Sequence, residues 1–203
     1  MRWYRPTCSW SCCGGDDPPR TAAKALQTHI SSLRHTLGDG FVLTEGTGWR
    51  LNTAETDAAR HQSLTKLGRD ALGAGDTSAA LIRFDEAAAL WRGIPELPDS
   101  RRGMSEKTRW IEAHSALVED RADALLATGR AAEIIGDLEA AVADAPLRER
   151  RWGQLMLALY RAGRQGEALG AYRRARSLLA DELGVDPGPE LRRLEARDRR
   201  SGS

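Results

Sequence analysis

The sequence predicts a mainly helical protein, in which a domain of stacked helix pairs follows one helix and a short β-hairpin. The clearest evidence is the stretch 147–186, which contains two amphipathic helices joined at Gly163. Apolar side chains recur at helical spacing on both: Leu155, Met156, Leu159, Tyr160 and Ala162, then Ala168, Leu169, Tyr172, Ala175, Leu178 and Leu179. Such a pair cannot bury both of its apolar faces alone, so it requires similar neighbours.

A repeated spacing indicates where those neighbours lie. Gly163 follows Gly129 by 34 positions, and Gly75 marks an earlier turn of the same type. Apolar residues stand three positions before each glycine and six positions after it: Leu72, Leu126 and Tyr160, then Leu81, Ile135 and Leu169. Agreement at several offsets favours a true repeat over chance similarity among Ala- and Leu-rich helices. Paired helices with a 34-residue period are typical of tetratricopeptide (TPR) repeats, so we expect a TPR-like domain.

Length and composition fit a soluble protein of one ordinary domain or two small ones. Of the 203 residues, 41% are hydrophobic and 29% charged, with a net charge of +1. The charge is uneven, since residues 53–145 carry 11 Lys and Arg against 17 Asp and Glu, whereas residues 146–203 carry 13 against 8. Only a local surface could therefore attract nucleic acid. The sequence has no apolar run of membrane-spanning length and no secretory signal, so we expect a cytoplasmic location.

No catalytic, metal or cofactor site is predicted. Residues 1–15 show neither helical nor strand periodicity, and we expect them to be unstructured. Three cysteines lie there, Cys8, Cys12 and Cys13, and reduced thiols fit them better than a metal site, which would need a fourth ligand such as His29. The sequence contains no Ser/His/Asp or Cys/His order and no paired carboxylates above chance, so we expect a protein that is not an enzyme.

The first predicted helix has a polar face suited to DNA. Residues 16–37 begin with two acidic residues and two prolines, which favour a helix start, and one face is apolar: Leu26, Ile30, Leu33 and Leu37. The opposite face carries Lys24, Thr28, Ser31 and His35 and is flanked by Gln27, Ser32 and Arg34, which are cations and short or flexible hydrogen-bonding groups without a carboxylate. A helix in the major groove needs such a face, because phosphates repel carboxylates. An ordinary solvated surface is the alternative.

A predicted β-hairpin directly follows this helix and favours the DNA interpretation. Residues 41–45 alternate, the sequence Gly46-Thr47-Gly48 turns the chain, and Trp49, Arg50 and Leu51 form the returning strand. A helix followed by such a hairpin corresponds to the last half of a winged helix, with a recognition helix and a wing. Arg50 is then placed to enter a minor groove or to pair with a phosphate.

Further helices follow in order. Thr56 or Asp57 can cap a helix that runs to residue 75, whose apolar stripe is Leu64, Leu67, Ala71 and Leu72. The next apolar stripe is Leu81, Phe84, Ala88 and Trp91, and residues 93–100 break the pattern as a loop. Helices are then expected over about 105–128, 130–143, the pair described above, and 190–200. We expect His114 to be a packed histidine rather than a ligand.

Three runs resemble a known family. They are LWRG at 90–93, PLRERRWGQLMLALYRAGRQGEAL at 146–169 and YRRARSLLADELGVDPGPEL at 172–191. Residues 53–196 are similar to the bacterial transcriptional activator domain of the SARP family of antibiotic-pathway regulators. Residues 16–52 resemble the second half of the OmpR-type winged helix that precedes it. The resemblance implies an activator of a biosynthetic gene cluster that binds promoter DNA, forms a homodimer and contacts RNA polymerase; many relatives have arginine where Ser32 stands.

The upstream part departs from this pattern. Family members carry a β-sheet and two helices before the recognition helix, and residues 1–15 match neither. The apolar residues Leu26, Ile30, Leu33 and Leu37 would need those helices to cover them. We therefore expect a folded helical domain over 53–196, an incomplete winged helix over 16–52 and a disordered tail over 197–203. A TPR-type interaction module that does not bind DNA is the alternative function.

Overall fold

The computed structural model describes residues 20–46, 48–52, 56–97 and 99–200. Of residues 199 and 200 it describes the backbone alone. The cysteines Cys8, Cys12 and Cys13, the segment 1–15 and the helix-start residues 16–19 lie outside the described residues. The chain forms two compact units: Met1–Gln62 with Leu90–His114, and Ser63–Ala89 with Ser115–Ser203. In the part that is described, no helix is both long and apolar enough to cross a bilayer.

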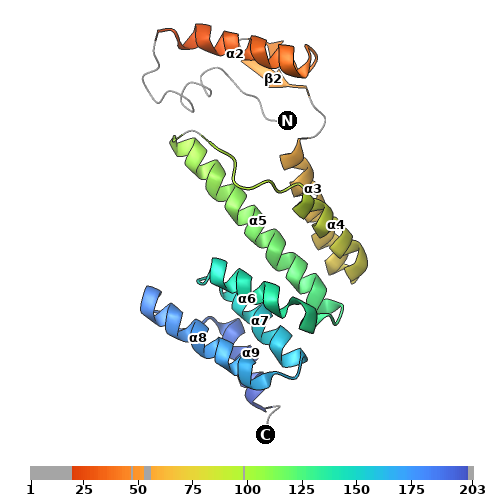
Figure 1. Ribbon diagram of the computed structural model, residues 1–203, viewed down its shortest axis with the longest axis vertical. Coiled ribbons are helices and arrows are strands. Elements are labelled where there is room, and N and C mark those ends of the chain that lie inside the picture. The colour runs from red at the N-terminus through yellow and green to blue at the C-terminus, as the bar shows by residue number, and fades with distance from the viewer. Residues whose placement is uncertain (1–19, 47, 53–55, 98, 201–203) are drawn as a thin grey trace. The chain divides into compact units, whose positions relative to one another are not determined.

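The first unit contains the predicted helix and hairpin (Figure 1). Helix α2 spans Ala22–Leu37, and strands β1 (Val42–Glu45) and β2 (Gly48–Leu51) pair antiparallel, with Val42 opposite Leu51. Gly38 ends α2 with φ of 96°, a conformation that favours glycine. Val42 is buried, whereas Phe41 is exposed. Helix, turn and hairpin therefore follow one another as predicted.

The later helices appear in the predicted order, with different bounds. They are α3 (Asp57–Gly73), α4 (Thr77–Ala89), α5 (Arg101–Ala127), the 3₁₀ helix η1 (Ala131–Ile134), α6 (Ile135–Asp144), α7 (Glu149–Arg161), α8 (Gln165–Leu183) and α9 (Pro189–Arg200). The expected start of α5 near residue 105 is wrong, because the Ser100 hydroxyl accepts a hydrogen bond from the Gly103 amide and caps the helix earlier. Helix α9 extends to Arg200, into the range expected to be a tail.

The glycine turns confirm the repeat. Gly75, Gly129 and Gly163 adopt nearly equal φ angles of 83°, 79° and 75°. Each ends a helix, and each amide donates a hydrogen bond to the carbonyl three residues earlier: Leu72, Leu126 and Tyr160. Leu72, Leu126 and Tyr160 are the apolar residues that stand three positions before each turn glycine in the predicted repeat. The same local geometry therefore recurs at all three turns.

The core of the second unit is built around α7. Leu155, Met156 and Leu159 on this helix are at most 1% exposed, and they pack in one cluster with buried side chains of α5, α6, α8 and α9. The predicted stripe of α8 is confirmed, since Ala168, Ala175 and Leu179 are buried and Leu169, Tyr172 and Leu178 are half-buried. Because α7 is covered on several sides, two of its polar residues, Arg151 and Gln154, are buried as well, and each donates a hydrogen bond to a backbone carbonyl.

Buried ion pairs join α5 to α7. Glu119 on α5 is 3% exposed, and Arg148 Nε lies 2.5 Å from its Oε1. Arg151 Nε lies 3.4 Å from the same oxygen. The guanidinium of Arg150 donates to Asp120 at 2.7 Å and to Asp123 at 2.6 Å. Burial lowers the pKa of Arg150, but the hydrogen bonds to Asp123 and Asp120 outweigh burial and raise the pKa above its usual value, so this cation stays charged.

Helices α3 and α4 cross at a glycine. Gly68 on α3 is buried against Phe84 on α4, and a Cβ added at Gly68 would lie 2.5 Å from Cε1 of that ring. Phe84 is fully buried, so its ring has no solvent to move into. The prediction that Leu67 belongs to the buried stripe of α3 is wrong, because Gly68 occupies the crossing and Leu67 is 49% exposed.

We predict that Gly68→Ala destabilises the second unit. Overpacking a buried contact costs about 1–3 kcal/mol, whereas Gly→Ala within a helix gains about 1 kcal/mol. Gly73→Ala in the same helix is the matched control, since an added Cβ there meets nothing within 4 Å. In urea unfolding, the free energy of unfolding of Gly68→Ala should be about 1–3 kcal/mol lower than that of Gly73→Ala. Equal values for the two variants would show that the contact between α3 and α4 has room for a methyl group.

A cluster of four aromatic rings belongs to the first unit. His114 on α5 stacks on Trp91 with ring centroids 3.9 Å apart and an interplanar angle of 6°, as expected for a packed histidine. His61 on α3 contacts Trp91 and Trp110, with centroids at 6.3 Å and 5.8 Å. Helix α4 ends at Ala89, so Trp91 lies in the following segment rather than on a helical stripe. The cluster attaches that segment to α3 and α5.

The titration of His61 should make the first unit sensitive to acid. Burial lowers the pKa of His61 below the ordinary value of 6.5. Below that ordinary value the unfolded chain binds more protons than the folded chain, so the free energy of unfolding falls as the pH drops. His61→Phe should flatten this dependence between about pH 7 and pH 5, measured by denaturant unfolding with tryptophan fluorescence. The control is His35→Gln at an exposed position, and an unchanged slope in His61→Phe would contradict the prediction.

Candidate nucleic-acid interface

Helix α2 presents the predicted polar face to solvent. Lys24, Gln27, Thr28, Ser31 and Ser32 are all exposed, and the helix contains no carboxylate. The Thr28 hydroxyl donates to the Lys24 carbonyl at 3.0 Å, so its oxygen remains available as an acceptor. The apolar residues Leu26 and Ile30 are half-buried, whereas Leu33 and Leu37 are exposed. One face of α2 therefore combines a cation with uncharged hydrogen-bonding groups.

Arg34 does not share this exposed position. Its side chain is half-buried, with Nε donating to the Val42 carbonyl at 2.8 Å and Nη2 donating to the Thr44 hydroxyl at 2.6 Å. Arg34 lies at the edge of the polar face, beside the apolar stripe, and the hairpin turns back toward that edge. The guanidinium is thus engaged with β1 in the free protein.

Arg50 lies in the hairpin with a partner of its own. Its Nε is 3.1 Å from Glu45 Oε2, and the two side chains are 23% and 38% exposed. The strand register places Leu43 opposite Arg50 and Glu45 opposite Gly48. The sequence shows the alternation of the strands, but it does not reveal the pairing of Arg50 with Glu45, which follows from the register and the turn. Arg50 is at the wing position, and its charge is partly balanced.

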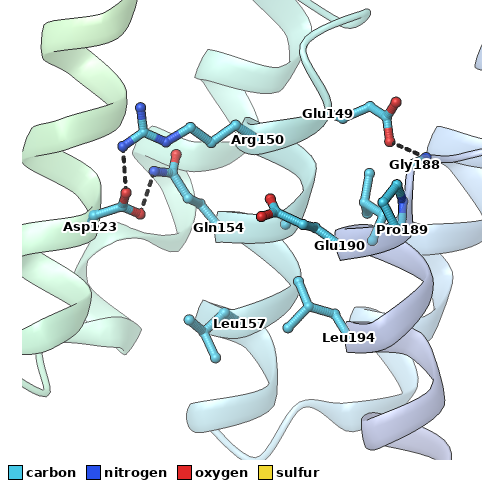
Figure 2. Close-up of a pocket in the computed structure, with 11 residues that line it drawn as sticks. Asp123, Glu149, Arg150, Gln154, Leu157, Gly188, Pro189, Glu190 and Leu194 are labelled. Carbon is cyan, nitrogen blue, oxygen red and sulfur yellow. Dashed lines mark hydrogen bonds and ion pairs between the residues drawn. The ribbon is translucent and has the colours of Figure 1, made fainter.

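A second candidate site lies in the other unit (Figure 2). A cavity of about 680 Å³ opens between α5, α7 and α9. Its walls combine polar and apolar side chains: Asp123, Glu149, Arg150, Gln154, Leu157, Glu190, Leu191 and Leu194, with Gly153, Gly188 and Pro189. Its volume lies within the range of small-molecule sites.

Most polar groups of this cavity are engaged within the protein. Glu149 accepts a hydrogen bond from the Gly188 amide at 2.6 Å, which ties the start of α9 to α7. The Gln154 amide donates to Asp123 and to the Glu119 carbonyl, at 2.6 Å and 2.7 Å. Among the described residues, no group of three or more His, Cys, Asp or Glu side chains is placed to hold a metal ion. The cavity walls therefore stabilise the helix packing.

Comparison with known proteins identifies the helical part. The profile of the bacterial transcriptional activator domain matches residues 56–197, which is most of the chain. The chain belongs to this family. DnrI from Streptomyces peucetius is 32% identical over 201 residues, and the match covers 89% of this chain and 72% of that regulatory protein. The resemblance to SARP-type regulators is thereby confirmed.

Other family members are larger than this chain. The regulatory protein AfsR from Streptomyces griseus is 39% identical over 187 residues, which are 90% of this chain but 19% of AfsR. The transcriptional regulatory protein EmbR from Mycobacterium tuberculosis is 37% identical over 196 residues, 89% of this chain and 49% of EmbR. The chain thus spans about a fifth of AfsR and about half of EmbR. These relatives are regulatory proteins rather than enzymes.

Solved structures confirm the fold class. Mycobacterium tuberculosis EmbR, in a complex with a low-affinity phosphopeptide, matches with a TM-score of 0.85 and 32% identity, over 98% of this chain and 55% of that one. The family likeness therefore reaches beyond residues 56–197, to α2 and the hairpin. The Sgt2 TPR domain from Aspergillus fumigatus matches with a TM-score of 0.51 and 18% identity, over 70% of this chain and 78% of that one. This second match shows a TPR-like fold alone.

Proposed function

We propose that this chain is a DNA-binding transcriptional regulator that activates a biosynthetic gene cluster. In this proposal residues 16–52 act as a winged helix on promoter DNA, and residues 53–196 form the activator domain. The observation that carries the proposal is the exposed, carboxylate-free face of α2 directly before a β-hairpin, in a chain with an activator domain. The names of the relatives favour this function over an interaction module that does not bind DNA.

The chemistry of α2 supports docking in the major groove. Lys24 supplies a positive charge, which suits a phosphate or the acceptor edge of guanine. Gln27 can donate to and accept from adenine, the hydroxyls of Ser31 and Ser32 can bond to either kind of edge, and the Thr28 oxygen can accept a hydrogen bond. Arg50 on the hairpin would approach the minor groove or a phosphate at the wing. Arg34 completes the proposed set.

The helical domain has the proposed role of bringing partners together. We infer homodimerisation and contact with RNA polymerase for residues 53–196 from the family resemblance, since stacked helix pairs offer extended surfaces for other proteins. A regulator of this kind works where the bacterial chromosome lies, so we place it in the cytoplasm. No cofactor is required for these contacts.

DNA binding can be tested with the full chain. Duplexes enriched from a random-sequence library should shift in a gel, with log affinity falling linearly against log salt concentration. Lys24→Gln should weaken binding, and if Lys24 contacts a phosphate the slope becomes shallower by about 0.9. Lys66→Gln, at an exposed position of α3, is the matched control and should leave both quantities unchanged. A slope near zero for the parent chain would refute the proposed function.

A further inference from the structure

The side chain of Arg34 connects α2 to the hairpin. Its Nε and Nη2 donate to two acceptors two residues apart on β1, the Val42 carbonyl at 2.8 Å and the Thr44 hydroxyl at 2.6 Å. The guanidinium is planar and holds its donors in a fixed fork, so two simultaneous bonds define an orientation as well as a distance. One side chain therefore fixes both the position and the direction of β1 relative to the last turns of α2.

The backbone around Arg34 reinforces this connection. The Arg34 carbonyl accepts a hydrogen bond from Gly38, and the Gly38 carbonyl accepts one from Phe41. Asn52, directly after β2, is bonded to the same connection: its backbone amide donates to the Phe41 carbonyl at 2.7 Å and its side chain donates to the Gly40 carbonyl at 3.0 Å. The connection between α2 and β1, residues 38–41, is thus hydrogen-bonded both to α2 and to the residue after β2. Helix and hairpin therefore form one body, and Arg34 is its side-chain tie to β1.

We propose that Arg34 is a positioning residue, which holds the wing at the angle that lets α2 and Arg50 reach DNA together. The inference rests on the proposed function and changes the role of one residue in it. The guanidinium already donates to the protein, and β1 carries Glu45, the partner of Arg50. A fixed β1 therefore fixes Arg50 as well. Arg34 acts on DNA recognition through the hairpin rather than through its own charge.

The competing role is a phosphate contact, in which Arg34 leaves β1 when DNA binds. The two roles respond differently to Arg34→Lys. Lysine keeps the positive charge but lacks the fork, so a phosphate contact would survive largely intact, whereas the tie to β1 would be lost. They also differ in their response to Thr44→Val. This change leaves the charge of Arg34 in place, so a phosphate contact would survive, whereas the tie to β1 would lose one of its two acceptors.

The test uses the full chain with the enriched duplex and three variants. Arg34→Lys and Thr44→Val each remove part of the tie, and Thr36→Val is the matched control, because the Thr36 hydroxyl donates to the Ser32 carbonyl within α2 and leaves Arg34 untouched. We expect Arg34→Lys and Thr44→Val to lower affinity at least several-fold, although the first keeps the positive charge and the second removes none. Hydroxyl-radical protection at the wing should be lost, while protection of guanine N7 in the major groove is retained. Thr36→Val should match the parent chain.

The hydrogen bonds between Arg34 and β1 can be tested without DNA. Hydrogen exchange of the Arg34 Nε–H, observed by ¹⁵N NMR, should be slow compared with that of exposed Arg20. Equal exchange rates would overturn the tie to β1. Near-parental binding by Arg34→Lys would overturn the positioning role and assign a phosphate contact. If the parent chain binds no duplex, the proposed function and the positioning role fail together, and the exchange rate still reports whether the tie exists.

Discussion

The packing of α5 to α9 depends on the pairing of one buried carboxylate. Glu119 is almost fully removed from water, and a buried charge of this kind is tolerated only with close partners of opposite charge. Arginines at the start of α7 provide them, and Gln154 one turn later donates to the Glu119 backbone carbonyl. These bonds fix the rotation of α7 about its own axis. That rotation decides which side chains enter the core and which reach the cavity beside α9.

The outer part of the same network forms one wall of that cavity. Asp123, Arg150 and Gln154 line it, and each is already bonded to another of the three or to α5 (Figure 2). A ligand that used these groups would have to break bonds that hold the helices together. The volume of the cavity is therefore a weaker indication of function than the polar face of α2. That face carries hydrogen-bonding groups that the fold does not need.

The sequence predicts the elements well and their mutual contacts poorly. Helical periodicity and the turn glycines locate the helix pairs, because both depend only on local spacing. The exposed face of α2 is also predictable, since a helix fixes which residues share a side. The ion pairs of Glu119 join residues about thirty positions apart, so their formation depends on how the helices pack. The partners of Arg34 and Arg50 likewise depend on the angle and register of the hairpin, which no local pattern encodes.

The segment between α4 and α5 shows where this architecture accepts variation in length. The helix pair after Gly75 is longer than its neighbour by 20 residues, yet the turns at Gly75 and Gly129 have nearly equal φ angles. The extra length is accommodated by a long α5 and by residues 92–97, which are exposed. The extra length is thus confined to one connection and the helix after it, while the turn geometry at the two glycines is preserved. That connection is the natural place to graft a peptide tag or a fused domain into the chain without disturbing the stack.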